Sequence, residues 1–208
     1  MFKLVSLKKV LTVLAVALLP YVGFSQDESL SQVFSKSYVF ESNSEYVKAA
    51  NVIKESKAST TYEGTLRMGW CYYLAKDYIQ SKTNYEKSVA LMPFAIEPHL
   101  GLANALAGLG NWEQVLEQYQ LILKTDPQNS LTLYRVGLIY YNRKDYGAAQ
   151  KYFEKVVNLY PFDYDSTIML AWTMFKLNKS IEAKVLFNKS LLMRPDDSSA
   201  TEGLKLIK

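Results

Sequence analysis

The feature that most constrains this 208-residue sequence is a proline that returns every 34 residues. The four members of the series are Pro93, Pro127, Pro161 and Pro195. The chain has only 6 prolines, so a spacing kept three times in succession indicates an internal repeat. Counted back from these prolines, the repeat units begin at residues 62, 96, 130 and 164.

Other residue types follow the same period. The smallest residues form one column, at Gly69, Ala103, Gly137 and Ala171. Aromatic residues form an unbroken second column, at Tyr85, Tyr119, Phe153 and Phe187. A third column, at Tyr78, Trp112 and Tyr146, lapses only at Ser180 and follows a short polar turn in each unit. Apolar residues within a unit recur at helical spacing, and a short turn between two helices makes them antiparallel. Proline then ends the second helix, because it lacks an N–H donor.

This order of small residue, short polar turn, two aromatic residues and terminal proline resembles the tetratricopeptide repeat. The resemblance covers residues 62–195, and residues 130–163 follow the pattern most closely. It implies an all-α fold, a right-handed solenoid of antiparallel helix pairs with a concave and a convex face. Stacking is required because a single helix pair cannot bury enough apolar surface to offset its loss of conformational entropy.

The period also predicts the domain organisation. We expect one solenoid over residues 26–208, in which residues 28–61 are a degenerate repeat whose spacing is off by about two residues. Complete repeats are expected at 62–95, 96–129, 130–163 and 164–197, followed by a capping helix at 198–208. Thr60-x-x-Glu63 and Ser199-x-x-Glu202 match the capping box and predict helix starts at these two places.

Residues 1–25 have the three-part pattern of a secretory signal. Lys3, Lys8 and Lys9 precede an uncharged apolar run, then Pro20, and then the small-residue pattern Gly23-Phe24-Ser25. We expect cleavage after Ser25 and a secreted or periplasmic mature chain that does not span a membrane. An uncleaved anchor is the alternative, although an apolar run of about 15 residues is shorter than the ~20 of a spanning helix. No cysteine follows the cleavage site, so we do not expect a lipoprotein.

Charge and chemistry exclude several classes of function. Without residues 1–25 the 24 basic residues fall to 21 against 20 acidic ones, so we do not expect nucleic-acid binding. His99 is the only histidine and Cys71 the only cysteine, which is too few for an acid–base pair or a closed zinc site. We therefore expect no enzyme activity, no metal and no cofactor. Cys71 is expected to be a buried free thiol.

In the family that the chain resembles, the first helix of each repeat lines the concave groove, which here would be apolar and aromatic with acids near one edge. The positions that carry over as a partner-binding groove are Leu66, Trp70, Tyr73, Leu74, Asn104, Tyr134, Leu138, Tyr141, Ile168, Trp172 and Phe175. Tryptophan and tyrosine often dominate binding energy at interfaces. The residues leave open whether these aromatics meet a partner, pack against one another or residues 28–61, or are buried in a homo-oligomer.

These observations favour a non-enzymatic adaptor or scaffold in the cell envelope. It would bind a protein or peptide partner, as an extended or helical segment, in the concave groove. Two alternatives remain: a chaperone-like holder of unassembled exported proteins, and an accessory subunit of an envelope enzyme complex.

Overall fold

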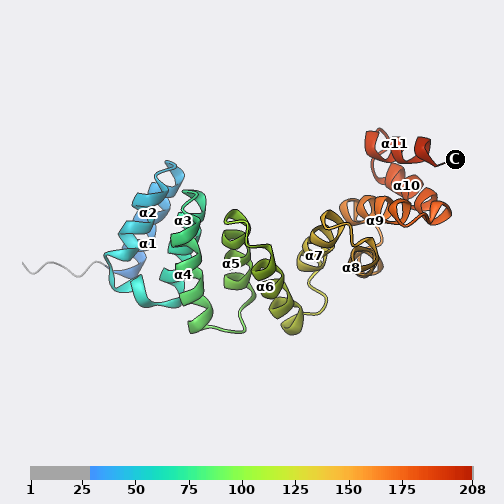
Figure 1. Ribbon diagram of the computed structural model, residues 1–208. Coiled ribbons are helices and arrows are strands. Elements are labelled where there is room, and N and C mark those ends of the chain that lie inside the picture. Colours follow the sequence, from blue (N-terminus) through green and yellow to red (C-terminus); the bar gives the residue numbers. More distant parts are fainter. Residues whose placement is uncertain (1–28, 208) are drawn as a thin grey trace, which may run out of the picture.

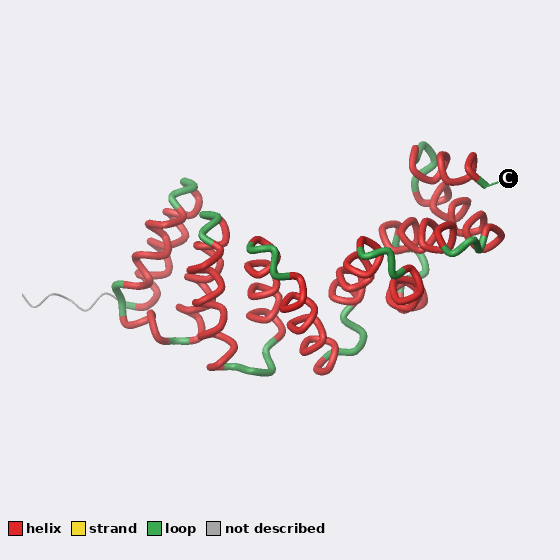
Figure 2. The backbone as a smooth tube through the Cα atoms, in the orientation of Figure 1, coloured by secondary structure: helices red, strands yellow, loops and turns green. Residues whose placement is uncertain are grey.

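The computed structural model describes residues 29–207, and the predicted signal segment lies outside this range. All regular secondary structure in the described range is helical, which confirms the all-α fold class. Figures 1 and 2 show the helices stacked side by side in an elongated, curved array. The elements are α1 (Leu30–Ser42), α2 (Tyr46–Lys54), the short 3₁₀ helix η1 (Lys57–Thr60), α3 (Tyr62–Leu74), α4 (Tyr78–Leu91), α5 (Ile96–Gly108), α6 (Trp112–Thr125), α7 (Ser130–Asn142), α8 (Tyr146–Leu159), α9 (Tyr164–Lys176), α10 (Ser180–Met193) and α11 (Ser198–Leu206).

The helices keep the phase of the proline period. The first helices α3, α5, α7 and α9 begin at residues 62, 96, 130 and 164, and each second helix ends two residues before a periodic proline. The turn inside each hairpin repeats as well, because one residue in it adopts a positive φ. These residues are Lys76 (60°), Gly110 (77°), Lys144 (62°) and Asn178 (60°). Only Gly110 reaches this left-handed region without a steric cost.

Residues 29–61 form a further helical hairpin at the N-terminal end of the stack. Its turn contains Ser44 with φ of 60°, as in the other hairpins. Helix α1 begins 32 residues before α3 instead of 34, which is the shift of two residues seen in the sequence. Helix α2 packs on α3 as α4 packs on α5, so this hairpin extends the stack and does not fold into its groove.

Two helix caps differ from the predicted capping boxes. The N-cap of α3 is Thr61, whose side chain accepts a hydrogen bond from the Gly64 N–H, because Thr60 still belongs to η1. The N-cap of α11 is Asp197 and not Ser199, since the Asp197 carboxylate accepts from the Ala200 N–H. The capping-box predictions at Thr60 and Ser199 were therefore wrong by one and two residues.

The unbroken aromatic column forms the centre of the core. Its four rings are almost completely buried. The Tyr85 ring lies against the small column of its own hairpin and also against the next one: a β-carbon placed on Gly69 would lie 3.0 Å from this ring, and one placed on Gly101 only 2.2 Å. The ring of Phe187 approaches Gly203 of α11 equally closely. Small residues therefore let one aromatic side chain join two consecutive hairpins.

Gly101→Ala should lower the free energy of unfolding by about 1–3 kcal/mol, because the new methyl group would overlap the buried Tyr85 ring. Gly147→Ala is the matched control. A β-carbon on Gly147 would find its nearest neighbour 3.9 Å away, so this change should stabilise by about 0.5–1 kcal/mol. Urea unfolding of both variants measures the difference. Equal effects would show that Tyr85 does not pack against α5 as described.

Consecutive hairpins meet through the second helix of one and the first helix of the next. Of these helix pairs, α6 and α7 pack least closely. Arg135 explains this spacing. It stands 34 residues after Gly101, so the α7 position that faces the Tyr119 ring carries a long side chain where α5 has glycine. The Arg135 guanidinium donates from Nη1 to Asn104 Oδ1 at 3.0 Å and to the Tyr119 hydroxyl at 3.4 Å. Hydrogen bonds from Arg135 therefore connect α7 to the preceding hairpin, in place of a close approach of the two backbones.

The first helices of the hairpins form the inner wall of the curve. Helix α3 contacts α5, α7 contacts α9, and α9 contacts α11, whereas the second helices make no comparable contacts with one another in the described part of the chain. Helices on the inside of a curved stack approach each other more closely than those on the outside. A site on the inner wall is therefore built from α1, α3, α5, α7 and α9.

Candidate functional site

The inner wall is hollowed at its N-terminal end by a cleft of about 950 Å³. We call it the inner cleft. Helices α1 and α3 and the first turn of α5 provide its walls. Its lining residues are Phe34, Tyr38, Glu41, Ser42, Tyr62, Glu63, Leu66, Arg67, Trp70 and Glu97. Aromatic and acidic side chains thus meet in one hollow.

Arg67 fixes the position of α1 against α3. Its Nε donates a 3.0 Å hydrogen bond to Ser37 Oγ, and its guanidinium forms an ion pair with Glu41. The Tyr38 ring lies over the guanidinium, with its centroid 3.9 Å from Cζ. Charged hydrogen bonds and a cation–π contact are strong when the cation is desolvated, as Arg67 is here. The two walls of the inner cleft are therefore held together by specific side chains.

Trp70 is the largest exposed apolar side chain in the inner cleft. Its Nε1 donates a 2.8 Å hydrogen bond to Glu41, and its ring stacks on Tyr73 with centroids 5.9 Å apart. The residue remains 39% exposed, so the indole is oriented by its neighbours and still offers a free surface. Leu66 lines the same cleft. Oriented aromatic side chains lose little entropy on binding, which suits them to anchor a partner.

The inner cleft has a negative charge. Glu63 and Glu97 are exposed, and neither forms an ion pair within residues 29–207, whereas Glu41 is paired with Arg67. Burial raises the pKa of the Tyr62 hydroxyl, and the carboxylates of Glu97 and Glu63 raise it further. Tyr62 therefore stays protonated at neutral pH and adds a neutral polar group to the cleft.

The sequence-predicted groove residues do not form one continuous surface. Leu66 and Trp70 line the inner cleft, and Tyr134 lines a separate hollow of about 760 Å³ between α7, α8 and α9. The remaining central positions are half-buried within the stack: Tyr73 packs near Tyr78, Tyr141 meets Tyr146 edge-on, Leu138 packs on the C-terminal core, Leu74 is half-buried, and Asn104 accepts from Arg135.

At the C-terminal end the predicted residues pack against α11. Trp172 Nε1 donates a 2.8 Å hydrogen bond to Ser199 Oγ, and its ring meets Phe187 edge-on at 5.0 Å. The Phe175 ring meets Trp172 edge-on at 5.8 Å, and Ile168 is buried. Trp172 therefore holds the last helix in place, and all three side chains are at least partly buried, so they offer little surface to a partner.

Sequence reasoning missed the part of the inner cleft that comes from α1. When positions five, nine, twelve and thirteen are counted from Leu30, where α1 actually begins, they are Phe34, Tyr38, Glu41 and Ser42. All four line the inner cleft. The shift of two residues in the first hairpin concealed them, although the same positional rule would have identified them from the correct start.

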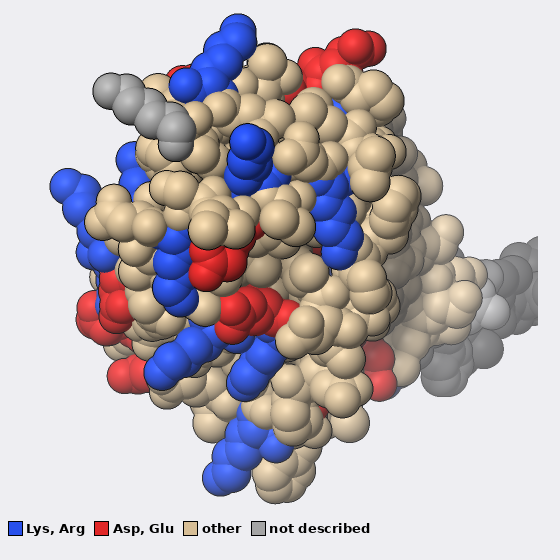
Figure 3. Space-filling model, turned by 90° about the vertical axis from the view of Figure 1, so that its right-hand side faces the viewer, with Lys and Arg blue, Asp and Glu red and all other residues tan. Residues whose placement is uncertain are grey.

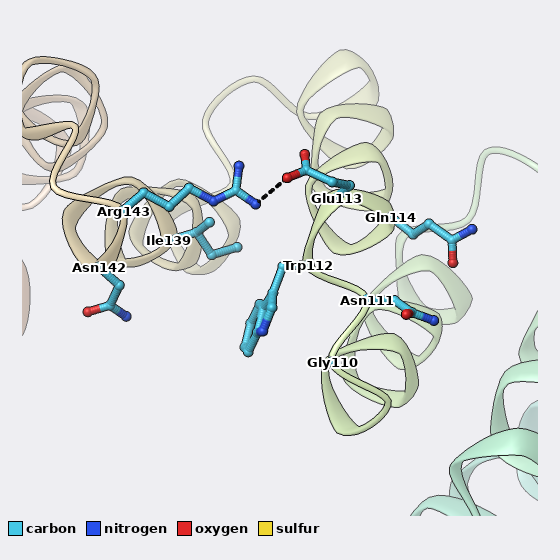
Figure 4. A pocket seen from close by; sticks show the side chains of 8 residues that line it. All are labelled: Gly110, Asn111, Trp112, Glu113, Gln114, Ile139, Asn142 and Arg143. Atoms are coloured by element: carbon cyan, nitrogen blue, oxygen red, sulfur yellow. Dashed lines mark hydrogen bonds and ion pairs between the residues drawn. The ribbon is translucent and has the colours of Figure 1, made fainter.

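A second hollow, of about 930 Å³, lies at the loose joint between α6 and α7 (Figure 4). Trp112 and Ile139 point into the space between the two helices, and the Arg143 guanidinium reaches across it to donate to Glu113 at 2.8 Å. Trp112 is 50% exposed. This hollow is at the edge of the solenoid where the hairpin turns lie, because residues 110–114 follow the turn between α5 and α6.

The single histidine and cysteine are both internal. His99 is buried between Gln118 Oε1, 2.7 Å from Nδ1, and the Pro93 carbonyl, 3.0 Å from Nε2, so it joins α5, α6 and the preceding loop. Cys71 is completely buried, and burial is the main reason that its pKa is raised. Within residues 29–207 no cluster of three or more His, Cys, Asp or Glu side chains is arranged to hold a metal ion.

The buried Cys71 thiol should not react with a thiol-specific reagent in the folded protein. A raised pKa keeps the group protonated at pH 8, and the thiolate is the reactive form. We expect labelling with 5,5′-dithiobis(2-nitrobenzoic acid) to be at least about 100-fold slower than in denaturant, because it requires local opening. Fast native-state labelling would contradict the packing of α2 on α3.

Positive and negative side chains are mixed on the face of the molecule that Figure 3 shows. At the C-terminal end, Lys and Arg side chains alternate with Asp and Glu, with no continuous basic face in that view (Figure 3). Among the helices in the described range, none is both long enough and apolar enough to cross a bilayer.

Comparisons with known proteins agree with this architecture. The sequence model of the tetratricopeptide repeat family matches residues 130–163, the unit that follows the repeat pattern most closely. A tetratricopeptide repeat protein from Parabacteroides merdae has a similar structure, with a TM-score of 0.73, 20% identity, and coverage of 84% of this chain and 70% of that one. YrrB, described as a tetratricopeptide protein with an unusual peptide-binding site, gives a TM-score of 0.69 at 17% identity, covering 88% of this chain and 94% of YrrB. Residues 130–163 are therefore a tetratricopeptide repeat, and the described residues have the fold of tetratricopeptide repeat proteins.

Curated relatives are larger proteins. Anaphase-promoting complex subunit 6 of Arabidopsis thaliana is 24% identical over 167 residues, which is 78% of this chain and 29% of the relative. RNA polymerase-associated protein CTR9 of Caenorhabditis elegans is 29% identical over 97 residues, covering 46% of this chain and 8% of that protein. The chain thus spans less than a third of the length of these relatives.

Proposed function

We propose that this protein is a non-enzymatic interaction scaffold that holds a segment of a partner protein in the inner cleft. One observation carries the proposal: α1, α3 and α5 form a hollow on the inner wall in which Trp70 is oriented by Glu41 and Tyr73, and Trp70, Leu66 and Tyr62 all remain accessible. An accessible apolar hollow on a protein surface is the usual mark of a binding site.

The inner cleft suits an extended segment or a single helix. Its aromatic walls supply apolar contacts to a bound segment, and the acidic side chains at its rim can orient that segment. The family that the chain resembles has a clamp for a partner's terminal carboxylate, which needs lysines and asparagines on the inner wall. Only Asn104, Asn142 and Lys176 are available for it, and Arg67, the one cation that lines the inner cleft, is already paired with Glu41. Recognition through apolar side chains of the partner is therefore favoured over recognition of a terminal carboxylate.

We place the scaffold in the cell envelope, on the strength of the three-part signal pattern in residues 1–25. Fractionation of the source cells, with mass spectrometry of the mature N-terminus, tests this part. The expected result is an envelope protein that begins at Gln26. A cytoplasmic protein that retains residues 1–25 would contradict it.

The scaffold role itself is tested by reversible crosslinking and affinity isolation from native envelopes. A scaffold gives one partner in a fixed stoichiometry. Many weakly bound clients, together with suppressed aggregation of unfolded exported proteins, would instead support a chaperone-like holder. Co-purification with a single active enzyme would support an accessory subunit. Recovery of the chain alone from crosslinked envelopes would contradict all three.

A further inference from the structure

Two carboxylates at the rim of the inner cleft have no ionic partner in the part of the chain that the structure describes. Glu63 and Glu97 are the second residues of α3 and α5. Acidic residues in a first turn stabilise the helix N-terminus, which accounts for their position in the sequence. Their carboxylates are nevertheless exposed at the cleft and unpaired within the described residues. Three carboxylates and one guanidinium line the inner cleft, so two negative charges remain uncompensated.

Apolar side chains lie close to these carboxylates. Tyr62 and Leu66 come from the first turns of α3, and Trp70 lies one turn further along the same helix. A ligand that reaches the two carboxylates therefore also covers an aromatic surface. A lysine or arginine with bulky apolar neighbours matches both features, because long basic side chains combine an apolar stem with a charged end.

A buried donor beneath the cleft gives an independent indication of a ligand. Arg67 is only 7% exposed, and its Nη2 has no hydrogen-bond partner among residues 29–207, whereas Nε and Nη1 are paired with Ser37 and Glu41. An unsatisfied buried donor costs about 1–3 kcal/mol. The exposed Tyr38 ring, which also lines the inner cleft, lies over the guanidinium. A polypeptide that displaces this ring would offer a backbone carbonyl to Nη2.

We propose that the inner cleft binds a partner segment in which lysine or arginine residues stand three positions apart among bulky apolar residues, an inference that depends on the scaffold function proposed above. Helices α3 and α5 are neighbours on the inner wall, and packed helices lie about 8–10 Å apart. A chain in the extended polyproline II conformation advances about 3.1 Å per residue, and its side chains return to the same side at every third residue. Two basic residues three positions apart therefore reach Glu63 and Glu97 together, with apolar residues between them over Tyr62 and Leu66.

The test uses three series of end-blocked decapeptides and the full chain. The series carry lysine, glutamine or glutamate at two positions three residues apart, with apolar residues elsewhere. Fluorescence anisotropy measures binding. We expect the lysine series to bind about 3- to 30-fold more tightly than the glutamine series, and the difference to shrink between about 50 and 500 mM salt.

Charge reversal gives the sharper result. The double variant Glu63→Lys with Glu97→Lys should prefer the glutamate series. Asp165→Lys is the matched control, because Asp165 occupies the same helix position on α9 outside the inner cleft, and it should keep the preference for lysine. Circular dichroism checks that both variants are folded.

Equal binding of the lysine and glutamine series would overturn the basic-segment inference and leave apolar binding in the cleft, and hence the scaffold function, intact. If none of the three peptide series binds, the basic-segment inference is also wrong. This result is expected if residues 1–25 or a second copy of the chain fill the cleft. The scaffold function is then judged separately by the crosslinked complex from native envelopes.

Discussion

Phe153→Ala is expected to lower the free energy of unfolding by about 3–5 kcal/mol, the largest stability effect that we predict for a single substitution. The Phe153 ring is completely buried. It lies 5.8 Å from the Tyr134 ring, and a β-carbon placed on Gly137 would be 2.7 Å away from it. Removing the ring leaves a cavity between α7, α8 and α9 that the backbone cannot close.

Urea unfolding followed by circular dichroism measures this effect. Phe94→Ala is the control, because Phe94 is 80% exposed in the loop after α4 and should change stability by no more than about 0.5 kcal/mol. A loss below about 1 kcal/mol for Phe153→Ala would show that the aromatic column is not the centre of the core.

Trp70→Ala is expected to weaken partner binding by at least about 30-fold, or about 2 kcal/mol, while the protein remains folded. The indole is the largest exposed apolar group in the inner cleft, and its bond to Glu41 and stacking on Tyr73 hold it in one orientation. Its removal would therefore cost apolar contact area and also the preorganisation that limits the entropic cost of binding.

Trp112→Ala provides the comparison for this experiment. Trp112 is more exposed than Trp70 but lies at the turn edge, in the hollow between α6 and α7. Affinity for the partner isolated from native envelopes, measured by calorimetry, should be unchanged in this variant. If Trp112→Ala lowers the affinity for the partner more than Trp70→Ala does, the binding site is at the turn edge and not in the inner cleft.

The helix phase could be predicted from sequence because each marker has a local physical cause. Pro93 and its periodic equivalents end the second helices, and the positive φ of Lys76 and Gly110 reverses the chain in the turns. These effects act within a few residues, so they are visible in one sequence. The 34-residue interval then fixes the start of every complete hairpin.

The candidate site was harder to predict because it depends on the ends of the stack. The positional rule assumes that a first helix faces open space, but α11 covers Trp172 through Ser199. At the other end, the two-residue shift of α1 hid Phe34 and Tyr38. The effect of Arg135 on the α6–α7 joint is equally non-local, since it depends on the Tyr119 hydroxyl and Asn104.

Site-specific photocrosslinking tests most directly whether the inner cleft is the partner-binding surface. A photoreactive amino acid is placed at Leu66, in the inner cleft, or at Ile79, which is 66% exposed on the second helix α4. After irradiation of native envelopes, we predict a discrete adduct with one partner from position 66 and none from position 79. An adduct from position 79 alone, or equal adducts from both positions, would contradict the assignment of binding to the inner wall.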